Sequence, residues 1–356
     1  MSLRHSRRLF LSLALIIPAP LLLTASVVQA STFDLPPIDR IVNYQPKLPL
    51  QVFTADGVEI AQFGTERREY LPLSKMPLRL QQAVLSVEDA RFREHSGVDP
   101  KGMARALVAA ITGGRKQGAS TITQQLVRTM LLTREFTAER KAKEIWLALK
   151  LEQELSKDRI LEIYLNEIFL GQRAYGFAAA SRTYFGKPLD KLSLAETAML
   201  AGLPQNPYYA NPVANLERAV KRQRVVLERM RAVGVIDDSQ LAAAKAEKLQ
   251  LRTRCPRSVN AAHVAEMARR AVVERFGTEA YSTGLKVTTS LKSADQRAAH
   301  EALQRGVLAY DRRGAWRGPE AFEAISGSGA ELERAAAEAL KDHRDDETLR
   351  VGIVLA

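Results

Sequence analysis

The sequence predicts a mainly α protein. Apolar residues recur at helical spacing from about residue 77 to residue 250, and glycine or proline interrupts this pattern at intervals that suit helix lengths. Alanine and leucine are abundant, whereas aromatic residues make up 6% of the chain, which also favours helices. With 356 residues, the chain is long enough for two or three domains of about 100–200 residues each.

The formal net charge of +12 predicts a basic surface. Such a surface suits nucleic acid, anionic lipid or phosphorylated substrates equally well. The sequence carries no zinc-finger spacing and no RNA-binding aromatic motif, so we expect no nucleic-acid partner. Cys255 is the single cysteine, which excludes a disulfide scaffold or a four-cysteine metal site.

The start of the chain predicts a membrane segment. Arg4, Arg7 and Arg8 precede an apolar run over residues 9–30, and a bilayer span needs about 20 residues. We expect an uncleaved signal-anchor, because the run is longer than a usual signal-peptide core. A cleaved signal is the alternative, since residues 28–30 resemble a signal-peptidase site and residues 6–11 a twin-arginine signal. In either case the basic flank stays in the cytoplasm and the remainder is exported.

Residues 31–76 predict a linker followed by a β-hairpin. Prolines crowd residues 31–50, which favours an extended chain. Residues 50–54 and 58–63 form two short alternating runs on either side of Asp56-Gly57, a pair typical of tight hairpin turns.

Helix boundaries can be read between residues 77 and 250. A helix over residues 100–111 should stop at Gly113-Gly114. Thr121 with Gln124, and Ser193 with Glu196, have the spacing of capping boxes, and Ser156 can cap a further helix. The other expected helices cover residues 139–155, 178–185 and 216–233.

Beyond residue 250 the character changes. We expect helices over residues 261–276 and 294–310, a strand over residues 284–291 and a last apolar strand over residues 349–355. Because a core-like strand would then end the chain without a partner, we expect the sequence to be a fragment of a longer protein or a truncated reading frame.

Residues 86–99 place carboxylates and a histidine beside an aromatic residue and a glycine. Glu88 follows Val87 at the border of the apolar face of a predicted helix. A partly desolvated carboxylate binds its proton more tightly, as a general base or acid requires. Taken alone, a charge cluster that solvates a loop is the simpler interpretation.

A second polar group lies on the predicted helix over residues 139–155. Lys141 and Glu144 are three residues apart and therefore share a helix face, beside Arg140. An ordinary surface ion pair is one interpretation; two cations placed to hold a phosphate are the other. Residues 118–125 supply hydroxyls, amides and a helix N-terminus that can hold polar oxygens or anionic groups.

In this order and spacing, the polar segments resemble the motifs of glycosyltransferase family 51, the enzymes that make the glycan strands of peptidoglycan. The resemblance covers about residues 50–235, and beyond them the chain is similar to the bifunctional 1A type of class A penicillin-binding proteins. The motifs are Glu88-Asp89 with Phe92, His95 and Gly97; residues 118–125; Arg140-Lys141 with Glu144; Lys157 to Gly176; and residues 200–205.

The resemblance implies polymerisation of lipid II, with inversion at C1 and release of undecaprenyl diphosphate. Glu88 matches the general base. Glu144 matches a second essential carboxylate that orients the cations, assists departure of the leaving group or holds a divalent ion. The substrate-binding positions are Ser120, Thr121, Gln124, Gln125, Arg128, Arg140 and Lys141, and Asp89, Phe92, His95 and Gly97 are expected to support Glu88. No cofactor is certain and no metal ligand is assigned, although Mg or Mn is compatible with the resemblance.

The same resemblance implies the domain organisation. A cytoplasmic tip and transmembrane anchor over residues 1–30 and the linker and hairpin over residues 31–76 would precede a lysozyme-like helical glycosyltransferase domain over residues 77–250. Residues 251–310 would lead toward a transpeptidase, and residues 311–356 would begin an inserted, truncated domain, which makes the C-terminal region partial α/β. The expected partners are lipid II, the lipid-linked glycan, membrane lipid and other cell-wall synthesis proteins, on the periplasmic side of a bacterial inner membrane.

The chain departs from this type in one respect and leaves two alternatives. No serine has a lysine three residues on and no Lys-Thr-Gly occurs, so we expect no transpeptidase activity. A lysozyme-like peptidoglycan hydrolase would also use a buried glutamate on a helical domain, although hydrolysis needs no cationic clamp. A non-catalytic, membrane-anchored cell-wall scaffold is the second alternative, and it leaves the ordered polar motifs unexplained.

Overall fold

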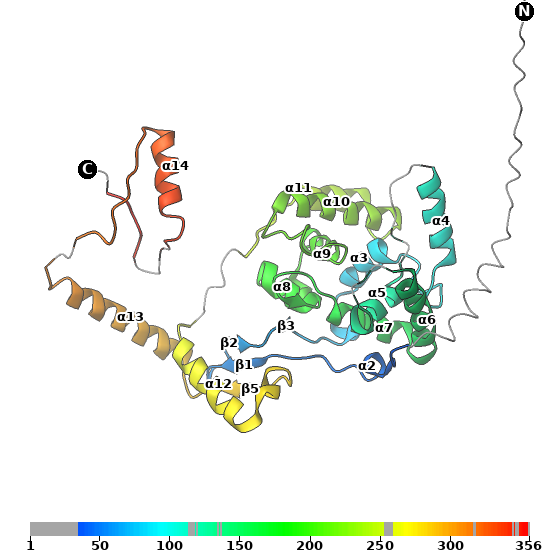
Figure 1. Cartoon of the computed structure of the whole chain (residues 1–356), viewed down its shortest axis with the longest axis horizontal. Coiled ribbons are helices and arrows are strands. Elements are labelled where there is room, and N and C mark those ends of the chain that lie inside the picture. The colour runs from blue at the N-terminus through cyan, green and yellow to red at the C-terminus, as the bar shows by residue number, and fades with distance from the viewer. Residues whose placement is uncertain are drawn as a thin grey trace, which may run out of the picture. The chain divides into compact units, whose positions relative to one another are not determined.

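The structure is a computed structural model, and its architecture is shown in Figure 1. It describes residues 35–112, 118, 120–133, 135, 137–252, 259–315, 318–343, 345 and 349–354. Within these residues, no helix is both long enough and apolar enough to cross a membrane. The predicted signal-anchor over residues 9–30 lies outside the described residues. The chain divides into two compact units, residues 1–296 and residues 297–356.

The first unit is mainly α, as the sequence predicts. Its helical part consists of α2 (Asp39–Val42), α3 (Leu78–Glu88), α4 (Pro100–Ile111), α5 (Ile122–Leu131), α6 (Ala138–Glu154), α7 (Lys157–Glu167), α8 (Phe177–Phe185), α9 (Leu194–Ala201), α10 (Leu216–Ala232) and α11 (Asp238–Ala246), with 3₁₀ turns η2 (Leu73–Lys75) and η3 (Leu189–Lys191). Two short strands, β3 (Arg67–Arg68) and β4 (Ala174–Tyr175), pair in parallel.

Two groups of helices share one apolar core. α3, α9 and α10 pack against one another, and α5 packs against both α6 and α7 (Figure 1). α7 is buried along most of its length, with Ile160, Leu161, Ile163, Tyr164 and Leu165 at 0–1% exposure. Such a helix is apolar on more than one face because it is surrounded by others. The end of α3 and the start of α5 are therefore held on a rigid frame.

The predicted capping residues fix the helix starts. Thr121 and Ser193 form capping boxes at the starts of α5 and α9, and the Ser156 hydroxyl caps α7. Each side chain accepts a backbone N–H that has no partner inside its helix. Asp99 caps α4, which ends at Ile111; the predicted stop at Gly113-Gly114 lies outside the described residues.

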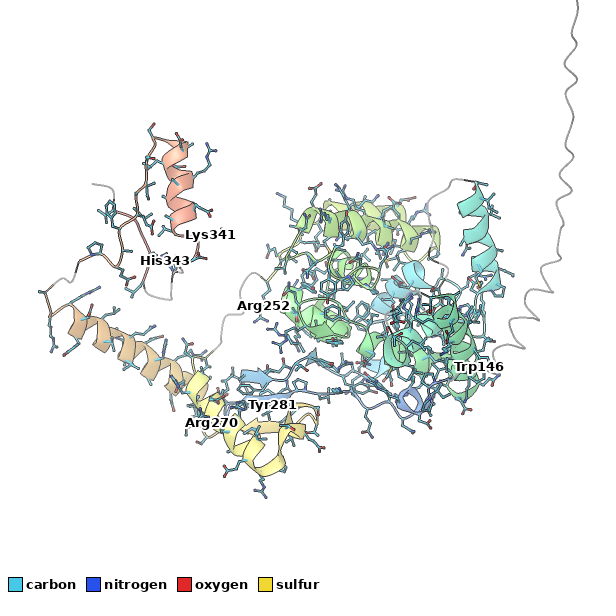
Figure 2. The ribbon with its side chains drawn as sticks, viewed as in Figure 1. Trp146, Arg252, Arg270, Tyr281, Lys341 and His343 are labelled. Atoms are coloured by element: carbon cyan, nitrogen blue, oxygen red, sulfur yellow. The ribbon has the colours of Figure 1, made fainter. Side chains whose placement is uncertain are left out.

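A small sheet joins segments that are far apart in the sequence. β1 (Leu50–Phe53) and β2 (Glu59–Phe63) form the predicted antiparallel hairpin. The predicted strand over residues 284–291 is confirmed as β5 (Lys286–Thr288), which pairs in parallel with β1. α12 (Ala262–Phe276) packs on this sheet, and the following turn η4 (Thr278–Tyr281) brings the Tyr281 hydroxyl to Arg269 of α12. Figure 2 labels Tyr281 and, on α12, Arg270.

The second unit contains helices rather than the predicted strand. α13 (Ser293–Asp311) begins at the end of the first unit and continues into the second, as predicted, and α14 (Ala330–Ala339) was not predicted. The expected strand over residues 349–355 is wrong for the part that the structure describes, since residues 349–354 form no strand. A strand needs a partner for its backbone groups, and Val354 is 95% exposed here rather than in a core.

Candidate active site

The site forms where the end of α3 meets the first turn of α5. Glu88 is the last residue of α3. Nε2 of Gln125, in the first turn of α5, donates to Oε2 of Glu88 at 2.9 Å. These two residues come from separate predicted motifs. The sequence gives only the order of the motifs along the chain, and the structure brings the two side chains into contact.

Glu88 is a buried carboxylate with one free oxygen. Its side chain is 10% exposed, and within the described part of the chain its Oε1 has no hydrogen-bond partner. Burial raises the pKa of Glu88, against the opposing effects of the Gln125 hydrogen bond and the positive charges of Arg222 and Arg128. Burial thus favours the protonated carboxyl group, and Oε1 is the oxygen that accepts no hydrogen bond among the described residues.

Asp89 supports this arrangement from the next position. Its Oδ2 accepts the backbone N–H of Ile122 at 3.0 Å, at the start of α5. Nε2 of His95 lies 3.0 Å from its Oδ1, and Phe92 packs edge-on against the His95 ring, with centroids 6.3 Å apart. These contacts tie the segment after Glu88 to the helix that carries Gln125.

Gly97 lets the same segment pass close to α6. Its φ is +87°, and a Cβ atom there would lie 2.7 Å from the carbonyl oxygen of Ala148. The Gly97 carbonyl accepts the Thr121 hydroxyl at 2.6 Å. Only glycine permits both this backbone conformation and this approach, so Gly97 and Thr121 lock the two predicted motifs together.

Glu144 forms the second half of the site. It is fully buried on α6, and its two oxygens separately accept from Arg140, at 2.9 Å, and from Lys141. Nζ of Lys141 also reaches Ser120 Oγ at 3.0 Å and Gln124 Oε1 at 3.5 Å. The side chain of Arg140 is 11% exposed and that of Lys141 40% exposed, so the ammonium group is the more accessible cation.

The two halves meet on adjacent residues of α5. Gln124 contacts Lys141, whereas Gln125 contacts Glu88. Arg128 lies one turn further along α5, half-buried, where its charge favours the ionised form of Glu88. A buried carboxylate and a cationic group are thus placed on either side of one helix turn.

The structure adds two residues that the sequence analysis did not assign to the site. Nη2 of Arg222, on α10, lies 3.7 Å from Oε1 of Glu88, and its Nε donates to the Gly202 carbonyl at 3.1 Å. The Tyr164 hydroxyl donates to Gln125 Oε1 at 3.0 Å. Tyr164 lies within the predicted motif from Lys157 to Gly176 and Arg222 on the predicted helix over residues 216–233, but no local signal in the sequence marks either residue.

The residues at this site do not fit a divalent cation. Both oxygens of Glu144 are already occupied by Arg140 and Lys141. Within the described ranges, no group of three or more His, Cys, Asp or Glu side chains converges, whereas Mg²⁺ and Mn²⁺ prefer several oxygen ligands. No step of the reaction at this site is therefore assigned to a metal ion.

Comparison with known proteins identifies the family. Residues 56–231 match the family model described as Transglycosylase. These residues form a Transglycosylase domain, which confirms the resemblance drawn from the motifs.

Its relatives include two proteins named penicillin-binding protein 1A. That of Neisseria lactamica is 45% identical over 302 residues, which cover 84% of this chain and 38% of the relative. That of Vibrio cholerae is 47% identical over 290 residues, 81% of this chain and 35% of the relative. The chain thus spans less than two-fifths of the length of these relatives. The crystal structure of penicillin-binding protein 1A from Haemophilus influenzae is 30% identical, covers 85% of this chain and 36% of that chain, and gives a TM-score of 0.48.

Proposed function

We propose that this chain is a peptidoglycan glycosyltransferase that polymerises lipid II into glycan strands. The observation that carries the proposal is the buried Glu88, whose Oε1 has no hydrogen-bond partner among the described residues. An alcohol is a weak nucleophile, so a base must accept its proton as the new bond forms. In our proposal Glu88 removes the proton from the 4-hydroxyl of the acceptor lipid II while this oxygen attacks C1 of the donor.

The leaving group is a lipid diphosphate, on which negative charge grows as the bond to C1 breaks. Positioned cations stabilise such charge. We assign this role to Lys141, with Arg140 beside it, and we assign to Glu144 the task of holding both cations in place. Attack on one face of the sugar and departure from the other give inversion at C1, as in inverting glycosidases.

The other predicted site residues divide by accessibility. Ser120 and Arg128 are half-buried, and we propose that they contact the substrate. Thr121, Gln124 and Gln125 are 1–7% exposed and form the hydrogen bonds within the site described above, so we assign them to its frame. To Asp89, Phe92, His95 and Gly97 we assign the support of Glu88.

The location and partners follow from the substrate. Lipid II and the growing glycan carry lipid tails, so the domain must work at a membrane surface. We propose that residues 1–30 anchor it in the inner membrane, single-pass, with the catalytic domain on the periplasmic side beside other cell-wall synthesis proteins. The net charge of +12 is favourable beside anionic lipid. Residues 251–310 would then lead toward a transpeptidase.

A polymerisation assay tests this proposal. Purified protein is incubated with labelled lipid II, and the glycan length and the released undecaprenyl diphosphate are measured. We expect long strands from the wild type and few from Glu144→Gln, because the buried carboxylate no longer holds the cations. Shortening of preformed strands would support the hydrolase instead, and no reaction with either substrate would support the scaffold.

A further inference from the structure

We propose that Tyr164 is a positioning residue that fixes the orientation of the Gln125 amide, so that its N–H group rather than its carbonyl faces Glu88. This inference deepens the proposed function and rests on it for the role of Glu88 as a base. It adds a residue on a third helix, α7, that acts on the base without touching it.

The geometry is a relay of two hydrogen bonds. The Tyr164 hydroxyl donates to Oε1 of Gln125 at 3.0 Å, and Nε2 of the same amide donates to Oε2 of Glu88 at 2.9 Å. A side-chain amide has one accepting end and one donating end. While the tyrosine hydroxyl donates to the accepting end, the donating end points toward Glu88.

Burial makes the orientation matter. Tyr164 is 1% exposed and Gln125 is 7% exposed, so water has little access to replace a lost hydrogen bond. An amide turned the other way would place its carbonyl oxygen against the Glu88 carboxylate, two acceptors in a poorly solvated space. The correct orientation also occupies Oε2, which leaves Oε1 as the atom that takes up the proton.

The charged groups around Glu88 do not perform the same task. Arg222 approaches from α10, Arg128 from α5, and Asp89 is its neighbour in sequence; all three act on Glu88 through charge. Arg222 lies 3.7 Å from Oε1, beyond hydrogen-bond distance, so its charge favours the ionised carboxylate without a hydrogen bond to either oxygen. In contrast, the Tyr164–Gln125 pair selects one oxygen.

The change Tyr164→Phe keeps the ring and removes the hydroxyl. The amide then loses the contact that fixes it, and Glu88 loses part of its hydrogen bond, which stabilises the ionised form. A hydrogen bond to a charged group corresponds to a shift of about one pH unit. We therefore expect the pKa of Glu88 to rise by about this amount, and the acidic limb of the polymerisation rate to move to higher pH equally.

The test is a ¹³C NMR titration of the full chain labelled at glutamate carboxyl carbons, with Glu88 assigned by Glu88→Gln. Tyr184→Phe is the matched control, because Tyr184 is also buried and its hydroxyl donates to the Leu170 carbonyl at 2.8 Å, away from Glu88. We expect a raised Glu88 pKa in Tyr164→Phe and no shift in Tyr184→Phe. Gln125→Met should raise it as well, and adding Tyr164→Phe to that variant should change nothing further.

Three results would overturn the proposal. They are an unchanged Glu88 pKa in Tyr164→Phe, an equal shift in Tyr184→Phe, or an undiminished effect of Tyr164→Phe in the Gln125→Met background. The titration needs no lipid II. A wild type that titrates as expected but forms no glycan would therefore contradict the proposed function and leave the positioning role of Tyr164 standing.

Discussion

Oδ2 of Asp89 accepts the backbone N–H of Ile122 at 3.0 Å, so the residue after the proposed base holds the first residue of α5. Gln125 follows Ile122 within the first turn and donates to Glu88. Two hydrogen bonds therefore hold the end of α3 to the start of α5. One joins the Asp89 side chain to the Ile122 backbone, and the other joins the side chains of Gln125 and Glu88.

The change Asp89→Asn should weaken the hydrogen bonding of residue 89 with Ile122 and His95. An asparagine amide that still accepts from Ile122 turns its N–H₂ toward His95, which must then accept at Nε2 and carry its proton on Nδ1. Nδ1 is buried and, among the described residues, has no partner. A buried N–H group without an acceptor costs about 1–3 kcal/mol, which urea denaturation at neutral pH can measure.

The control for this variant is Asp158→Asn. The Asp158 pair with Arg93 is exposed on both sides, and its loss should change the free energy of unfolding by less than about 0.5 kcal/mol. Equal effects of the two changes would contradict the supporting role of Asp89.

Glu88 and Glu144 should respond oppositely to neutralisation. Burial raises the pKa of Glu88, so the folded state binds its proton more tightly than the unfolded state, and the carboxylate destabilises the fold at neutral pH. We expect Glu88→Gln to raise the free energy of unfolding by about 1 kcal/mol. This gain should shrink as the pH falls through the raised pKa, and disappear below the ordinary carboxylate range.

By contrast, Glu144→Gln leaves two cations without their buried carboxylate. We expect a loss of about 2–3 kcal/mol, because Lys141 remains partly solvated while Arg140 does not. Thermal or urea denaturation of both variants at pH 8 measures the difference. If Glu88→Gln and Glu144→Gln destabilise the fold to the same degree, the ionised Glu88 carboxylate does not destabilise the fold.

Arg222 should tune the pH dependence of the reaction. Its guanidinium lies 3.7 Å from Oε1 of Glu88, and a nearby positive charge favours the ionised carboxylate. Removal of this charge in Arg222→Gln should raise the pKa of Glu88 and move the acidic limb of the rate profile to higher pH. Arg222→Lys should keep most of the wild-type profile, and a profile that is the same in all three proteins would exclude this interaction.

Alanine substitutions at two glycines with similar φ angles can distinguish the cost of backbone strain from the cost of a steric clash. Gly97 and Gly57 have φ of +87° and +82°, but a Cβ atom would meet the Ala148 carbonyl at 2.7 Å only in the first case, with nothing within 4 Å in the second. We expect Gly57→Ala to cost about 1 kcal/mol. Gly97→Ala should cost more and should lower activity, because it pushes the segment after Glu88 away from α6; similar losses in both would contradict this.

Local signals in the sequence predicted much of this frame. Thr121, Ser156 and Ser193 mark helix starts because capping depends on residues three positions apart, and the hairpin around Asp56-Gly57 is equally local. The parallel pairing of β5 with β1 could not be predicted from the sequence, because it joins strands far apart in the chain and depends on the packing of the segments between them.

Within the site as well, some residues could be predicted from local signals in the sequence and others depend on how the helices pack. Glu88, Arg140, Lys141 and Glu144 could be proposed from motif spacing. Arg222 and Tyr164 could not, because their roles depend on how α10 and α7 pack against α3 and α5. The strand expected near residue 350 was wrong for a related reason: apolar residues form a strand only where the fold offers a neighbouring strand, and residues 349–354 form no strand.

The most direct test of the central claim is the polymerisation rate of Glu88→Gln with labelled lipid II. The variant keeps the shape of the side chain but cannot accept the proton of the acceptor hydroxyl. We expect a loss of about 10²–10⁴-fold, the usual contribution of a positioned base, in a protein whose melting temperature is not lowered. A rate within about twofold of the wild type would contradict it, since such a small factor is far below what a general base supplies.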